Sequence, residues 1–70
     1  MTQSYSIILN GEERILRMPT TISDLLEELG FPPLGIAVAV NMNVIPRSEH
    51  PSYILPADAR VEVIRAVGGG

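Results

Sequence analysis

The stretch TISDLLEELG, Thr21 to Gly30, predicts a short amphipathic helix with a defined start and end. Thr21 and Asp24 have the spacing of a capping box, in which each side chain accepts a hydrogen bond from the other residue's backbone amide. Gly30 suits the left-handed conformation that ends many helices, and Pro32-Pro33 prevents continuation. The apolar residues recur at helical spacing and form one stripe: Ile22, Leu25, Leu26 and Leu29. This stripe needs another apolar surface to cover it.

Two strands joined by a tight turn are predicted before the helix. Tyr5 to Leu9 is rich in strand-forming residues, and Asn10-Gly11 accepts the positive φ angles of a two-residue hairpin turn. Glu12 to Met18 is the returning strand. The residues expected on the buried side of this hairpin are Tyr5, Ile7 and Leu9 in the first strand and Leu16 and Met18 in the second.

Three further strands are predicted after the helix. Ile36 to Val40 alternates bulky with small side chains, and Val44-Ile45 follows a turn as a short strand. Arg47 to Leu55 indicates a loop with one helical turn, and Ala59 to Val67 is the last strand. The simplest packing lays the helix across the apolar face of the sheet. We therefore predict an α+β fold of the β-grasp type, with a mixed sheet of about four to five strands whose last strand lies centrally and parallel to the first.

Size and composition exclude several classes of function. The chain has 70 residues, of which 46% are hydrophobic, so it is one domain with enough apolar side chains for a core. It has no room to enclose an enzyme active site with its own substrate pocket. Because it has no cysteine, it offers no disulfide, thiolate nucleophile or zinc finger. The net charge of −3 argues against a nucleic-acid-binding surface.

Location and reactivity are limited by the same composition. No apolar run approaches the length of a membrane span, and the N-terminus lacks the pattern of a signal peptide, so we expect a cytoplasmic protein without membrane contact. All five basic residues are arginines. The chain therefore has no side-chain amine for isopeptide bonds to itself.

The last predicted strand breaks its own alternation. Its polar face carries Arg60 and Glu62, but the apolar Ile64 follows on that same face. An isolated exposed apolar residue is often incidental. The alternative is that Ile64 forms, with Ala37 and Ala39 of the neighbouring strand, a flat docking face that directs the chain end into a partner.

The sequence ends in AVGGG, Ala66 to Gly70. We therefore divide the chain into a domain, residues 1–67, and a flexible glycine tail, residues 68–70. Without Cβ atoms, three glycines fit a channel too narrow for side chains, and they span at most about 10 Å. A terminal carboxylate is ionised at neutral pH and is a poor electrophile. It reacts only if another protein activates it as an acyl phosphate or acyl adenylate. The alternative is an idle, disordered end.

Four stretches carry a pattern that is specific in combination. They are LNGEE (Leu9 to Glu13), TISDLLEELG (Thr21 to Gly30), AVAVNMNVIPRSEH (Ala37 to His50) and VEVIRAVGGG (Val61 to Gly70). The chain resembles in these stretches the ThiS-type sulfur carrier proteins of thiamine biosynthesis, which have the ubiquitin-like β-grasp fold. One departure is Asp58-Ala59, where such chains often have Gly-Asp. Asp tolerates the left-handed conformation better than most residues.

The resemblance implies a protein cosubstrate and not an enzyme. A ThiF-type, ubiquitin-activating-like enzyme would adenylate the terminal glycine with ATP. Sulfur from a cysteine desulfurase or rhodanese would displace AMP, and the resulting thiocarboxylate would supply a ThiG-type thiazole synthase. By position, Gly70 would bear the sulfur, while Gly69 and Gly68 would thread the tail into the partner. No bound cofactor or metal is implied.

Candidate residues for partner docking are Ala37, Ala39, Arg47, Ile64 and Ala66. Arg47 either binds a partner's acidic group through its guanidinium fork or has an intramolecular or solvated role. His50, the only histidine, is expected to be a surface or loop residue. Alternative functions are a MoaD-type carrier for molybdopterin synthase, a carrier for another pathway, a ubiquitin-like modifier conjugated through Gly70, and an interaction domain.

Overall fold

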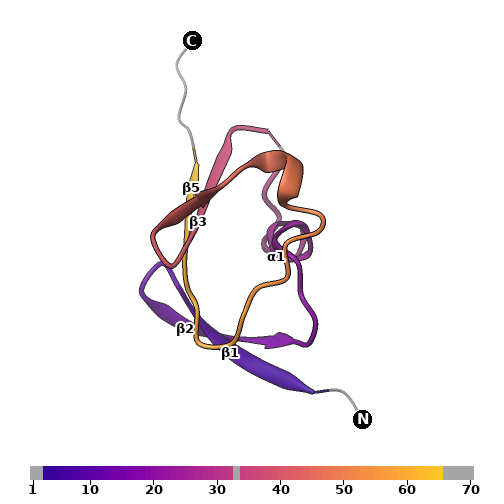
Figure 1. Ribbon diagram of the computed structural model, residues 1–70, viewed down its shortest axis with the longest axis vertical. Coiled ribbons are helices and arrows are strands. Elements are labelled where there is room, and N and C mark those ends of the chain that lie inside the picture. The colour runs from indigo at the N-terminus through magenta and orange to yellow at the C-terminus, as the bar shows by residue number, and fades with distance from the viewer. Residues whose placement is uncertain (1–2, 33, 66–70) are drawn as a thin grey trace.

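The computed structural model describes residues 3–32 and 34–65 (Figure 1). This part of the chain forms a sheet of five strands, one α-helix and one 3-10 turn. The elements are β1 (Ser4–Leu9), β2 (Glu12–Arg17), α1 (Ile22–Leu29), β3 (Ile36–Val40), β4 (Asn43–Ile45), η1 (Arg47–Glu49) and β5 (Arg60–Arg65).

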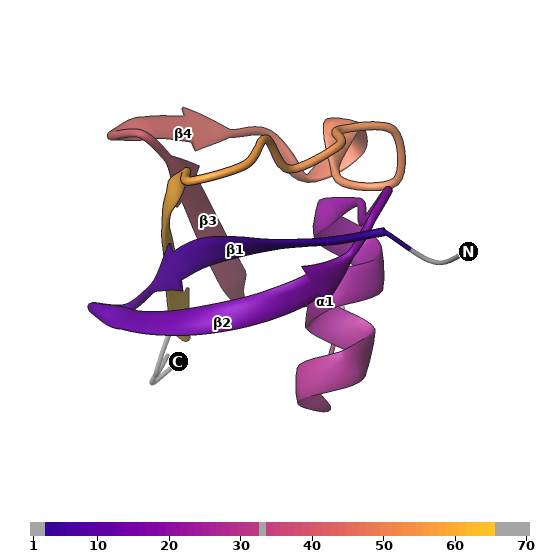
Figure 2. The same cartoon turned by 90° about the horizontal axis from the view of Figure 1, so that it is seen from below.

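The sheet is mixed, and its last strand is central. The strand order is β2-β1-β5-β3-β4. β1 and β5 run parallel, whereas the pairs β1–β2, β3–β5 and β3–β4 are antiparallel. Figures 1 and 2 show α1 packed across one face of this sheet, while the other face carries no helix. The predicted α+β, β-grasp fold is confirmed.

The helix begins and ends where its sequence predicts. The Thr21 hydroxyl accepts from the Asp24 amide at 3.1 Å, and the Asp24 carboxylate accepts from the Thr21 amide at 3.2 Å, which completes the capping box. Gly30 ends the helix in the left-handed region, with φ 79°. The Phe31 amide donates to the Leu26 carbonyl at 3.0 Å, and Phe31 packs against the core. These contacts satisfy backbone groups that every helix end leaves free.

The core lies between α1 and the inner face of the sheet. Its fully or nearly fully buried apolar side chains come from every strand, from the helix and from the segment before β5: Ile7, Leu16, Ile22, Leu25, Leu26, Val38, Val40, Ile45, Leu55, Ala59, Val61 and Val63. The expectation that Met18 shares the buried side of the hairpin was wrong, because its side chain is 47% exposed. β2 ends at Arg17, and the bend before Pro19 carries Met18 out of the strand's alternation.

The last strand is shorter at its start than predicted. Ala59 is buried but precedes β5, which begins at Arg60 and is described to Arg65. Asp58 occupies the left-handed region, with φ 62°, as its tolerance of that conformation allows. The departure at Asp58-Ala59 therefore leaves the entry into β5 intact.

Two asparagines in the hairpin turns hold the backbone of β5 from both sides. Asn10 receives a hydrogen bond from the Val63 amide at 2.9 Å and donates to the Val63 carbonyl at 3.3 Å. Asn41 receives one from the Arg60 amide at 2.9 Å. The Asn10 contacts extend the β1–β5 pairing beyond the end of β1 at Leu9. They fix the last strand close to the point where the chain continues toward its glycines.

Replacing Asn10 is expected to loosen this attachment in two separable ways. Asn10→Gly removes two hydrogen bonds and keeps the φ of 49°, so it should cost about 1–2 kcal/mol of unfolding free energy. Asn10→Ala also forces an alanine into the left-handed region, which should add about 1 kcal/mol. Equilibrium urea denaturation measures both. Equal stability of the two variants would show that the turn is not strained. If neither variant lost unfolding free energy, the hydrogen bonds to Val63 would not stabilise the fold.

Candidate functional site

The outer face of the sheet exposes apolar side chains beside the end of β5. Ile64 is 59% exposed, although Val63 before it is buried in the core. In the antiparallel ladder between β3 and β5, Ile64 lies directly opposite Ala37, and Glu62 lies opposite Ala39. The break in alternation at Ile64 therefore places an apolar side chain in solvent, next to two small residues.

A fourth apolar residue joins this surface. Val44 of β4 pairs with Ala39 and is 74% exposed. We call the surface formed by Ala37, Ala39, Val44 and Ile64 the docking face. Sequence reasoning missed Val44, although its alternation with the buried Ile45 indicated an outward side chain. The two small alanine side chains lie on the middle strand, β3, and the larger side chains of Ile64 and Val44 lie on the strands to either side.

The chemistry of the docking face is that of contact, not of catalysis. Its four side chains are aliphatic and have no nucleophile, acid or base. The charged Glu62 borders it on β5. A partner would gain chiefly by removing exposed apolar area from water, at about 25 cal/mol per Å².

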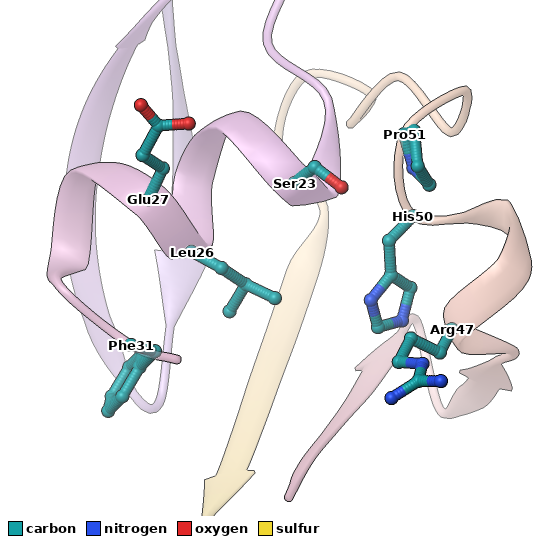
Figure 3. Close-up of a pocket in the computed structure, with 7 residues that line it drawn as sticks. All are labelled: Ser23, Leu26, Glu27, Phe31, Arg47, His50 and Pro51. Atoms are coloured by element: carbon teal, nitrogen blue, oxygen red, sulfur yellow. The ribbon is translucent and has the colours of Figure 1, made fainter. Parts of the chain in front are cut away.

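Arg47 lies away from the docking face, on the helix side of the molecule. It lines a cavity of about 470 Å³ between α1 and the segment that follows β4 (Figure 3). The cavity is lined by Ser23, Leu26, Glu27, Phe31, Arg47, His50 and Pro51. The structure thus brings Ala37, Ala39 and Ile64 together and puts Arg47 at a separate surface.

His50 lies in a turn after η1, but it is not a surface residue. Its side chain is 4% exposed, and Nε2 lies 3.0 Å from the Ile45 carbonyl. Since a carbonyl only accepts, Nε2 carries the proton in this contact. Of the expected surface or loop position, the loop position is confirmed and the surface position is wrong, because this turn packs against the helix: the Ser23 amide donates to the His50 carbonyl at 3.1 Å. Nothing in the local sequence indicated this contact.

Four predicted site residues lie outside the described part of the chain: Ala66, Gly68, Gly69 and Gly70. The predicted boundary between residues 67 and 68 lies there too. Within residues 3–32 and 34–65, no group of three or more His, Asp or Glu side chains is arranged to hold a metal ion. Among the same residues, no helix has the length and apolar character that crossing a bilayer requires.

Comparison with known proteins finds relatives that are much longer than this chain and one of about the same length. The chain is 39% identical over 64 residues to a thiazole synthase of Magnetococcus marinus and 31% identical over 64 residues to one of Paramagnetospirillum magneticum. These matches cover 91% of this chain but only 20% of each relative. An uncharacterized protein, ycf40, of Porphyra purpurea is 37% identical over 71 residues, which is 100% of this chain and 99% of that protein.

A solved structure has the same fold. The crystal structure of the thiamine biosynthesis protein ThiS from Geobacter metallireducens superposes with a TM-score of 0.77, at 20% identity, over 93% of this chain and 99% of that one. The model of the ThiS family matches residues 6–70, which include the whole sheet from Ser6 onward, the helix and the terminal glycines. The chain belongs to the ThiS family.

Proposed function

We propose that this chain is a sulfur carrier of thiamine biosynthesis, which carries the sulfur as a thiocarboxylate on Gly70. The main support is that the match to the ThiS family continues to residue 70 and so includes the terminal glycines. A second support is the docking face, which lies beside the last described residues of β5. In this role the protein is a cosubstrate of other enzymes and needs no cofactor or metal of its own.

The chemistry takes place at the terminal carboxylate in two steps. In the first, a carboxylate oxygen attacks the α-phosphate of ATP on an activating enzyme, pyrophosphate leaves, and an acyl adenylate forms. In the second, the terminal sulfur of a persulfide on a desulfurase or rhodanese attacks the carbonyl carbon, and AMP leaves to give an acyl disulfide. A thiol then attacks the donor's sulfur in that disulfide, which releases the thiocarboxylate and leaves the donor and the thiol joined as a disulfide. The net change replaces one C–O bond with a C–S bond. This domain supplies recognition and delivery, and its partners supply the catalytic groups.

The acceptor that we propose is a thiazole synthase. Two of the similar proteins have that name, and the matched segment makes up 20% of each polypeptide. In such a protein the tethered segment would be held at high local concentration near the synthase. We propose that this chain performs the same transfer in the cytoplasm, where ATP is available.

One reaction tests the proposal. The protein is incubated with ATP, a sulfur donor and an activating enzyme of the ThiF type, and the intact mass is recorded. Exchange of one oxygen for sulfur is the expected result, and deletion of the chain's gene should create a thiamine requirement. Attachment to lysines of other proteins would indicate a ubiquitin-like modifier instead. An unchanged mass, under conditions in which a known carrier reacts, would refute both functions.

A further inference from the structure

The cavity lined by Arg47 is a groove with a buried floor, and the charged residues Arg47 and Glu27 are among its lining residues. Figure 3 shows the Leu26 side chain pointing toward the His50 ring, with the Arg47 guanidinium beside that ring and the Glu27 carboxylate turned away from both. Leu26 and His50 are 6% and 4% exposed, so they form the floor and not the opening. A groove of about 470 Å³ has room for one or two large side chains of a partner.

The two ends of the groove differ in what borders them. At one end, backbone hydrogen bonds join the N-terminal turn of α1 to the segment that follows β4. The Ser23 amide donates to the His50 carbonyl at 3.1 Å, and the Ile22 amide donates to the Tyr53 carbonyl at 3.0 Å. At the other end, the groove is bordered by Phe31. The guanidinium carbon of Arg65 lies 5.8 Å from the centroid of the Phe31 ring. The Phe31 end of the groove is therefore near the C-terminal end of β5.

Within the described residues the Arg47 guanidinium has no ion-pair partner, although Glu27 also lines the groove. Arg14 forms an ion pair with Glu28 at 2.9 Å. No carboxylate of residues 3–32 and 34–65 lies within 4.0 Å of the Arg47 guanidinium in the same way. Arg47 is the one arginine among the lining residues, and Arg65 lies beyond Phe31, outside the lining. A complementary occupant has a carboxylate beside an apolar side chain.

We propose that this groove is a second docking site, which binds a segment of the activating enzyme with a large apolar side chain next to an Asp or Glu. The apolar side chain fills the space over Leu26, and the carboxylate pairs with Arg47. The docking face lies on the outer face of the sheet and includes Ile64 of β5, whereas the groove lies on the helix side, where Phe31 is near Arg65 of β5. The enzyme then holds the domain from two sides at the point where the chain enters it. This inference rests on the proposed function.

The activating enzyme is the partner that gains most from such a groove. In the similar thiazole synthases the matched segment belongs to the same polypeptide, so in those proteins the encounter with the synthase needs little separate affinity. An activating enzyme meets the carrier by diffusion. A charged contact near the entry point raises the rate of productive encounter and fixes the orientation.

Steady-state adenylation, followed as pyrophosphate release at increasing carrier concentration, tests the groove. Arg47→Glu should raise the KM for the carrier about tenfold and leave kcat within about twofold. Ser23→Met, which fills the groove with a side chain that helices tolerate, should raise KM by a smaller factor. The KM of the unmodified chain should also rise more steeply with salt than that of Arg47→Glu, because the variant has lost the attraction that salt screens.

Arg17→Glu is the matched control. Arg17 is an exposed arginine at the end of β2, the edge strand opposite β4. Its replacement by Glu changes the net charge by the same amount as Arg47→Glu. The KM of Arg17→Glu should stay within about twofold of the unmodified value at physiological salt. Thermal unfolding checks that each variant is folded. Equal KM values for Arg47→Glu and Arg17→Glu would overturn the inference alone. An unmodified chain that is never adenylated would overturn the proposed function, and this inference with it.

Discussion

A chain that lacks Gly70 is expected to accept almost no sulfur, although it folds like the full-length protein and still ends in Gly-Gly. Removal of one residue withdraws the terminal carboxylate by about 3.3–3.6 Å. The attacking oxygen and the α-phosphate must approach to about 3–3.5 Å, and a misplacement of 1 Å can cost about 100-fold in rate. We therefore expect a loss of at least about 100-fold. Intact mass after incubation with ATP, sulfur donor and activating enzyme measures it.

The control for this deletion is a chain lengthened by one further glycine. It also ends in Gly-Gly, but its carboxylate is displaced in the opposite direction along the tail. If reach decides the reaction, both variants react poorly, and their urea midpoints match that of the unmodified chain. Near-normal sulfur transfer to the shortened chain would show that a terminal Gly-Gly pair is sufficient and that the length of the tail is not measured by the partner.

Ile64→Glu is expected to weaken recognition by the activating enzyme at least tenfold while the domain keeps its stability. Burial of an isoleucine side chain in an interface contributes about 1.5–3 kcal/mol, and 1.4 kcal/mol corresponds to a factor of ten in affinity. A carboxylate at this position also has to be desolvated beside Ala37. Because Ile64 is 59% exposed in the free domain, the substitution should change the free energy of unfolding by no more than about 0.5 kcal/mol.

Ile15→Glu provides a closely matched control. Ile15 is 62% exposed and lies on β2, at the edge of the sheet farthest from the β3–β4 hairpin. The two substitutions make the same change in charge and side-chain volume, and the two isoleucines that they replace are similarly exposed. The KM for the carrier in pyrophosphate release should rise for Ile64→Glu and not for Ile15→Glu. A parallel loss of melting temperature and activity in Ile64→Glu would mean that this residue supports the fold, and would refute the docking face.

Local patterns predicted the elements of the fold because their causes are local. The capping box of Thr21 and Asp24, the left-handed Gly30 and the Asn10-Gly11 turn each involve residues within a few positions of one another. The central, parallel place of the last strand also followed, since its valines required burial on the inner face. The exposed position of Ile64 could be predicted because this residue interrupts the alternation of polar and apolar side chains in the last strand.

The errors and omissions concern contacts between distant parts of the chain. The burial of His50 depends on a backbone hydrogen bond to Ser23, which is 27 positions away in sequence. The side-chain amide of Asn10 binds β5 across 53 positions, a role that its turn conformation did not indicate. The groove beside Arg47 arises only when the segment after β4 lies against α1. No periodicity within one element contains this information.

The paired environment of β5 has a mechanical consequence. A partner that pulls on the C-terminus loads a strand that is hydrogen-bonded to β1 on one side and to β3 on the other, with Asn10 adding two more bonds near its end. Because β1 and β5 are parallel neighbours, tension between the N-terminus and the C-terminus shears their hydrogen bonds together and does not peel them one at a time. The domain should therefore stay folded while its last residues are drawn into another enzyme and released again.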